Sequence, residues 1–217
     1  MFLCAVMLVL GMVGTASALD FDFSGTFTQD NDVSLLNFTV GSDSTITIFS
    51  SSWGNGIGTY GYDAGAGFDP ILTIWDNDGN LVEEQDDVWS VGYATSNSVT
   101  YSYGFYDSYY NASLTAGDYT ASITQYDNFA AGDNLSDGFD RDSDPTFTQE
   151  RGNAYPPHTY FNGVWNDSDY RTGDWVFHIV NVAEASQQNP VPEPSTILLM
   201  GIGLLGMVGY SRKRKKS

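Results

Sequence analysis

One short segment of the sequence decides the fold class: Ile71-Leu72-Thr73-Ile74-Trp75, followed by Asp76-Asn77-Asp78-Gly79-Asn80 and then by Leu81-Val82. The first five residues are almost continuously apolar, which is typical of a central strand buried on both faces. The Asp78-Gly79 pair suits a two-residue β-hairpin turn, because both central residues of such a turn adopt positive φ. The segment therefore predicts two antiparallel strands joined by a tight turn.

The chain between its two ends repeats this strand pattern. Apolar residues alternate with polar ones at a period of two in several further runs: Phe21/Phe23, Leu36/Phe38/Val40, Ile46/Ile48, Tyr101/Tyr103/Phe105, Tyr119/Ala121/Ile123 and Val176/His178/Val180/Val182. Clusters of Gly, Asn, Asp and Ser separate these runs. The pattern predicts an all-β domain over residues 19–183, in which two antiparallel sheets pack face to face as a sandwich or jelly roll.

The N-terminal end has the features of a secretory signal peptide. The apolar stretch Phe2–Val13 is followed by Ala16-Ser17-Ala18, a small-residue cleavage pattern before Leu19. We therefore expect a signal helix within residues 1–18, with signal peptidase cutting after Ala18. No Lys or Arg precedes the apolar stretch, so an uncleaved N-terminal anchor is the alternative interpretation.

The C-terminal end has three parts with different physical roles. Residues 184–194 predict a polar linker that contains Val191-Pro192-Glu193-Pro194, since two prolines cannot continue a helix or a central strand. The apolar residues 195–211 predict a short transmembrane helix. Five Lys and Arg residues in the tail 212–217 favour retention of that end in the cytoplasm.

The order of these three parts resembles the PEP-CTERM sorting signal of exported bacterial proteins, a tail type that is also named after ice-binding proteins. The resemblance implies recognition by an exosortase, a membrane-embedded protease, with cleavage near Pro192–Pro194. It also implies transient anchoring in the inner membrane by the C-terminal helix, followed by display at the cell surface or secretion.

A second resemblance covers much of the region between the two ends. Gly67–Leu72, Trp75–Leu81, Asp86-Asp87 and Leu114–Thr120 resemble the β-sandwich module known as the pre-peptidase C-terminal domain. Three further motifs resemble an uncharacterised family of exported proteins with PEP-CTERM tails: Thr124–Phe129, Asn134–Phe139 and Arg171–Trp175. These resemblances imply the fold and export, and they imply no activity.

The charge of the predicted domain limits its partners. Residues 19–191 contain three arginines, no lysine and 26 acidic residues, a net charge of −23. Nucleic acid and anionic lipid are therefore excluded, because phosphate binding needs clustered cations. Cations, neutral glycans and basic proteins remain. The single cysteine, Cys4, lies in the leader, so cysteine chemistry is also excluded from the mature domain.

Two groups of aspartates are candidate Ca²⁺ ligands, because hard oxygen donors suit that ion. One group is Asp76, Asp78, Asp86 and Asp87; the other is Asp137, Asp140, Asp142 and Asp144. Neither matches an EF-hand loop, since the required glycine is misplaced or replaced by proline. A plain turn and a solvated acidic loop are the alternatives.

The aromatic residues between Trp53 and Tyr110 are mostly expected in the core or in cross-strand pairs. Tyr106, Tyr109 and Tyr110 are expected in an exposed loop, where their rings could stack on sugars. His158 and His178 are the only candidate bases at neutral pH, and His178 is predicted to be a structural residue on a strand.

We therefore expect a non-enzymatic protein with a structural or adhesive role in the envelope or the exopolysaccharide matrix. A glycan-binding or calcium-binding module is the alternative. A hydrolase with an acidic site is a third interpretation, which a pocket containing two converging carboxylates with a raised pKa would favour.

Overall fold

A computed structural model describes residues 17–53, 67–150 and 172–188 of the chain. The predicted signal helix, the predicted transmembrane helix and His158 lie outside these residues. Within the described ranges, no helix combines the length and the apolar character that crossing a bilayer requires.

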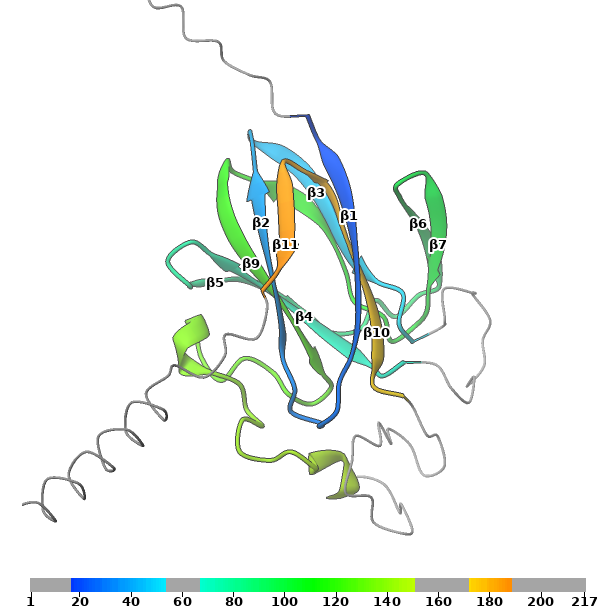
Figure 1. The fold of residues 1–217 in the computed structure, drawn as a ribbon, viewed down its shortest axis with the longest axis vertical. Helices are drawn as coiled ribbons and strands as arrows, with labels where there is room; N and C mark the ends of the chain where they lie inside the picture. Colours follow the sequence, from blue (N-terminus) through cyan, green and yellow to red (C-terminus); the bar gives the residue numbers. More distant parts are fainter. Residues whose placement is uncertain (1–16, 54–66, 151–171, 189–217) are drawn as a thin grey trace, which may run out of the picture. The chain divides into compact units, whose positions relative to one another are not determined.

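Eleven strands form the described part of the chain (Figure 1). Their bounds are β1 Leu19–Thr26, β2 Ser34–Val40, β3 Ser44–Ser50, β4 Pro70–Asp76, β5 Leu81–Gln85, β6 Gly92–Ser96, β7 Val99–Tyr103, β8 Tyr109–Leu114, β9 Gly117–Gln125, β10 Asp174–Val182 and β11 Glu184–Gln187. One sheet has the order β1-β10-β3-β8, a second has the order β11-β2-β9-β4-β5, and β6 pairs with β7. All of these pairings are antiparallel.

The core lies between the four-stranded and five-stranded sheets. It takes alternate residues from both, including Phe38, Leu72, Ile123, Phe177 and Ile179, and each of these side chains is at most 2% exposed. Burial of each such side chain stabilises the folded state by about 1.5–3 kcal/mol. The all-β prediction and the two antiparallel sheets packed face to face are confirmed.

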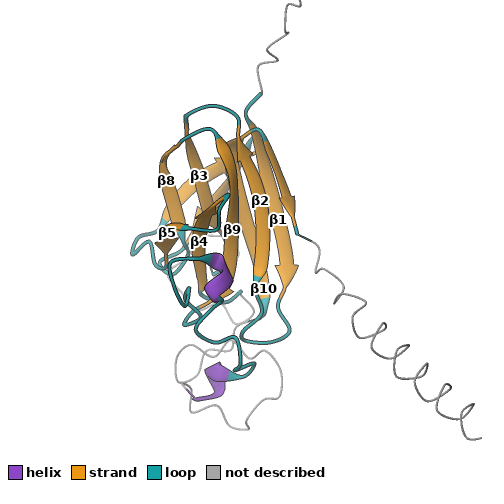
Figure 2. Cartoon of the chain, turned by 90° about the vertical axis from the view of Figure 1, so that its left-hand side faces the viewer, coloured by secondary structure: helices purple, strands orange, loops and turns teal. Residues whose placement is uncertain are grey.

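Strand β4 is buried on both of its faces. Ile71, Leu72, Thr73, Ile74 and Trp75 are all 0% exposed. The segment after β9 covers the face that points away from the core; its Phe139 ring meets the Trp75 ring edge-on at 6.4 Å. Figure 2 shows this covering segment with its short 3-10 helices in purple. The sequence prediction for β4 is confirmed.

The β6–β7 hairpin covers part of the outer face of the four-stranded sheet (Figure 1). The Tyr101 ring lies 4.0 Å from the ring of His178 on β10, and the Tyr103 ring lies 4.9 Å from that of Tyr109 on β8. Strand β10 is consequently covered on both sides. Its side chains in the core cluster are Trp175, Phe177, Ile179 and Val182, so Val182 is the one member of the Val176/His178/Val180/Val182 set singled out in the sequence that faces the core.

Two details differ from the sequence predictions: the type of the Asp78-Gly79 turn and the start of the polar linker. In the Asp78-Gly79 turn only Gly79 has positive φ, 79°. Its N–H donates to the Asp76 carbonyl at 2.9 Å, and the Asp76 N–H donates to the Asn80 carbonyl at 2.9 Å. The turn is therefore longer than the predicted two-residue turn, and a single residue in the left-handed conformation is enough to match the twist of the two strands. The linker also starts later than residue 184, because the polar strand β11 extends the sheet through backbone pairing with β2.

We predict that Ile74→Ala lowers the free energy of unfolding by about 2–5 kcal/mol, because it leaves a cavity between the sheets. Denaturant unfolding measures the loss. The control is Val82→Ala on β5, where the side chain is 39% exposed and the expected change is within about 0.5 kcal/mol. Equal losses in the two variants would contradict the description of the core.

Candidate functional site

Three carboxylates meet at one end of the β4–β5 hairpin. Asp69 directly precedes β4, while Asp86 and Asp87 directly follow β5. Because β4 and β5 run antiparallel with Leu72 opposite Gln85, the start of one strand lies beside the end of the other. One oxygen from each of the three aspartates lies within 4.8 Å of the others. We call this set the carboxylate trio.

Two members of the trio, Asp86 and Asp87, have raised pKa values. Burial raises the pKa of Asp86 to about 7, with further contributions from the charges of Asp87, Glu84 and Asp127. Burial also raises the pKa of Asp87 to about 6. The Oδ1 atoms of Asp86 and Asp87 are inaccessible to solvent and have no hydrogen-bond partner among the described residues. Such oxygens attract hydroxyl donors or a cation.

The structure brings Asp86 and Asp87 together with Asp69, whereas the sequence grouped them with Asp76 and Asp78. Asp76 instead organises its own turn: its Oδ1 accepts the Asp78 N–H at 3.0 Å and the Asn80 N–H at 2.8 Å. These bonds, led by one from the Asn80 side chain, lower the pKa of Asp76. The third member of the trio is Asp69, which the sequence did not reveal because it lies 17 positions before Asp86.

In the second predicted calcium group, Asp137 and Asp142 are local hydrogen-bond acceptors. Asp137 Oδ2 accepts the Asn134 N–H at 3.2 Å, and Asp142 Oδ2 accepts the Phe139 N–H at 3.1 Å. Among the described residues, the trio is the set of acids whose oxygens come close enough to share an ion, and neither Asp140 nor Asp144 belongs to it. Three oxygens are fewer than the six to eight that Ca²⁺ takes. Calcium binding stays a prediction.

His178 is held from both sides in the interior. Its Nδ1 lies 2.7 Å from Asp22 Oδ1, and its Nε2 lies 3.0 Å from Ser51 Oγ. Burial lowers the pKa of His178, and the bond to Asp22 opposes that effect. The order of groups is that of a Ser-His-Asp triad. However, His178 is 0% and Ser51 is 3% exposed.

The Asp22 carboxylate also ties the β6–β7 turn to β1. Its oxygens accept from Ser96 Oγ at 2.5 Å and from Asn97 Nδ2 at 2.9 Å. This network therefore connects the hairpin to the four-stranded sheet, and the prediction of a structural histidine is confirmed. The sequence did not reveal Asp22 or Ser51, since polar residues that alternate with apolar ones on a strand usually face water.

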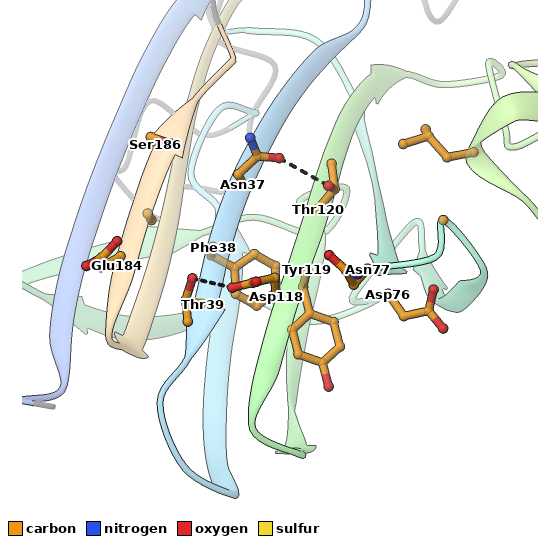
Figure 3. A pocket seen from close by; sticks show the side chains of 13 residues that line it. Asn37, Phe38, Thr39, Asp76, Asn77, Asp118, Tyr119, Thr120, Glu184 and Ser186 are labelled. Atoms are coloured by element: carbon orange, nitrogen blue, oxygen red, sulfur yellow. Dashed lines mark hydrogen bonds between the residues drawn. The ribbon is translucent and has the colours of Figure 1, made fainter. Parts of the chain in front are cut away.

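A polar pocket of about 450 Å³ lies on the face of the five-stranded sheet that points away from the core (Figure 3). Hydroxyl, amide and carboxylate side chains line it together with apolar ones such as Phe38 and Leu135, and two pairs of the polar side chains are hydrogen-bonded to each other. Thr39 Oγ1 donates to Asp118 Oδ1 at 2.7 Å, and Thr120 Oγ1 donates to Asn37 Oδ1 at 3.2 Å. The hydrolase interpretation would be favoured by a pocket that contains two converging carboxylates with raised pKa values. Asp86 and Asp87 have raised pKa values, but no member of the trio lines this pocket.

The tyrosines predicted to contact glycans are not in one exposed loop. Tyr109 and Tyr110 begin β8, and Tyr110 is 8% exposed within the core cluster. Tyr106 packs at 4.6 Å on Trp53, which is 7% exposed. Among the described aromatic residues between Trp53 and Tyr110, the most exposed are Tyr93, at 71%, and Trp89, at 66%. The sequence grouped Trp89 with expected core residues.

Comparison with known proteins identifies the C-terminal tail. Residues 190–215 match the family model described as the PEP-CTERM protein-sorting motif. The chain carries a PEP-CTERM motif. This motif implies an exported protein with a membrane-anchored sorting signal that an exosortase processes.

The other comparisons contribute less. The pre-peptidase C-terminal domain of collagenase from Bacillus anthracis aligns with 77% of this chain and 90% of that chain, at 10% identity and a TM-score of 0.33. A TM-score this low carries no argument about a shared fold or function. No curated protein matches the chain.

We predict that Asp86 and Asp87 lower the free energy of unfolding as pH rises from about 4 to about 7, because they hold protons in the folded state that the unfolded chain releases. A raised folded-state pKa stabilises the fold only below that pKa, so the sign follows from Asp86 and Asp87. Asp86→Asn should flatten this slope and stabilise the protein above neutral pH. The control is Asp78→Asn in the exposed turn, and an unchanged slope in Asp86→Asn would contradict the prediction.

The same variants test the calcium prediction. We expect calcium to raise the melting temperature more than sodium chloride of equal ionic strength, because a ligand that binds only the folded state stabilises it. Asp86→Asn should remove the excess, while Asp78→Asn should retain it. Equal shifts with both salts would indicate simple screening.

Proposed function

We propose that this protein is a non-catalytic component of the cell surface or exopolysaccharide matrix, with a structural or adhesive role. The observation that supports the proposal most strongly is the PEP-CTERM motif at residues 190–215, which follows directly on a β-sandwich that ends with β11 at Gln187. A domain delivered in this way works outside the cytoplasm.

His178, a candidate base within the described residues, has a structural role. His178 is buried between Asp22 and Ser51 and helps to hold the β6–β7 hairpin. The carboxylate trio lies away from the polar pocket. Both observations support binding or scaffolding rather than turnover of a substrate.

The charge of the domain supports a matrix role with neutral or cationic partners. Residues 19–191 carry a net charge of −23. A surface of this kind stays soluble and repels anionic polymers. Neutral polysaccharide and basic protein surfaces are therefore the matrix components that fit it.

We predict that the mature protein begins near Leu19 and ends near Pro192–Pro194. Signal peptidase removes the leader after Ala18, and exosortase removes the apolar helix with its basic tail. Mass spectrometry of the protein recovered from native cells, fraction by fraction, measures both ends. Recovery of surface protein that still carries Lys213–Lys216 would replace the proposed sorting by a permanent anchor.

A further inference from the structure

The polar pocket of the five-stranded sheet contains a row of carboxylates that crosses the strands. Glu184 on β11 pairs in register with Thr39 on β2, and Thr39 pairs with Asp118 on β9. The next strand, β4, places Asp76 opposite Tyr119, one residue beyond Asp118. Figure 3 shows Glu184, Asp118 and Asp76 in this order from left to right. We call these three residues the acidic row.

The acidic row is too widely spread to share one cation. Neighbouring strands lie about 4.8 Å apart, so Glu184 and Asp118 are separated by about 10 Å, and Asp76 lies one strand further along. Their oxygens are not among those of the described residues that come close enough together to hold one metal ion. Several positive charges spaced along one molecule match such a row better than a single ion does.

Within the described part of the chain, no basic side chain neutralises the acidic row. The lining of the pocket includes no Lys, Arg or His. Arg141 is the only Lys or Arg in the described ranges, and it pairs with Asp127 and lies over the Phe147 ring. A hollow lined by charges of one sign attracts ligands of the opposite sign and raises their local concentration.

Local hydrogen bonds hold two of the three carboxylates in place. Asp118 Oδ1 accepts from Thr39 Oγ1 at 2.7 Å. Asp76 accepts from the Asn80 side chain and from two backbone N–H groups of its turn. These bonds, led by that of the Asn80 side chain, lower the pKa of Asp76, so this carboxylate stays ionised at neutral pH. A ligand therefore meets charges that are already positioned, which reduces the cost of ordering on binding.

A second row of side chains in the same pocket is neutral. Ser186, Asn37 and Thr120 are register partners on β11, β2 and β9, two residues along these strands from the acidic row. Thr120 Oγ1 donates to Asn37 Oδ1 at 3.2 Å. Hydroxyl and amide groups can both donate to and accept from the backbone of an extended peptide.

We propose that this pocket binds an extended segment of a basic partner protein through its Lys or Arg side chains. The cationic side chains lie along the acidic row, and the backbone of the segment bonds to the neutral row. A neutral saccharide is the competing class of ligand, because it also bonds to hydroxyl and amide groups, but it gains nothing from the charge of the acidic row. This inference deepens the proposed matrix role by naming one class of partner, and it rests on that role for its biological setting.

The experiment titrates the full chain with an alternating Lys/Ser peptide and with a Gln/Ser peptide of equal length, at low and at high salt. Isothermal calorimetry measures the affinities. We expect the Lys/Ser peptide to bind more tightly, and salt to weaken only its binding, because salt screens exposed charges. Asp118→Asn should weaken binding of the Lys/Ser peptide about two- to fivefold, and the double variant Asp118→Asn/Glu184→Gln about four- to twentyfold.

The matched control is Asp140→Asn. Asp140 is exposed and does not line the pocket, and its substitution changes the net charge by the same amount as Asp118→Asn. Binding of the Lys/Ser peptide should therefore stay unchanged in this variant. The basic tail at residues 212–217 is present in every variant, so its effect cancels in the comparison. Melting temperatures of all variants exclude unfolding as the cause of a loss.

Several outcomes would overturn the inference. They are equal losses in Asp118→Asn and Asp140→Asn, equal binding of the two peptides, no binding of the Lys/Ser peptide at low salt, and tighter binding of neutral gluco-, manno- or xylo-oligosaccharides than of that peptide. The proposed function has a separate test, because failure of peptide binding in a correctly processed surface protein contradicts only this inference. Peptide binding by a surface protein that retains its basic tail contradicts only the sorting role.

Discussion

Burial of β4 on both faces is the constraint on which the rest of the structure depends. One face of the strand packs in the core between the two sheets. The other face carries Trp75, which can leave water only if another part of the chain covers it. The segment after β9 does so through Phe139. The need to cover an apolar strand therefore explains why a long irregular segment lies against the five-stranded sheet.

The protein satisfies many of its aspartates with N–H and hydroxyl donors instead of cations. Asp107 accepts bonds from three backbone N–H groups and a serine. Asp30, which is 0% exposed, accepts from the Thr148 N–H at 2.9 Å and from its hydroxyl at 2.6 Å. Asp22 ties the β6–β7 turn to the sheet. Because residues 19–191 contain only three arginines, donors from the chain itself compensate these buried charges.

Asp86 and Asp87 differ from these aspartates, because part of each carboxylate lacks a hydrogen-bond donor. Each has a buried oxygen without a partner among the described residues, and burial raises the pKa of both. Residues with perturbed pKa values and locally unfavourable arrangements cluster at functional sites.

The sequence by itself determined the all-β class, the burial of β4 on both faces and the PEP-CTERM tail, because each depends on residues close together in the chain. Period-two alternation, a continuous apolar run and an apolar segment followed by basic residues are all local patterns. Only the tertiary structure decided that Asp69 joins Asp86 and Asp87, that His178 is buried under a hairpin, and that Trp89 is exposed. Those facts depend on strand register and on which segments cover which faces, and long-range packing alone determines both.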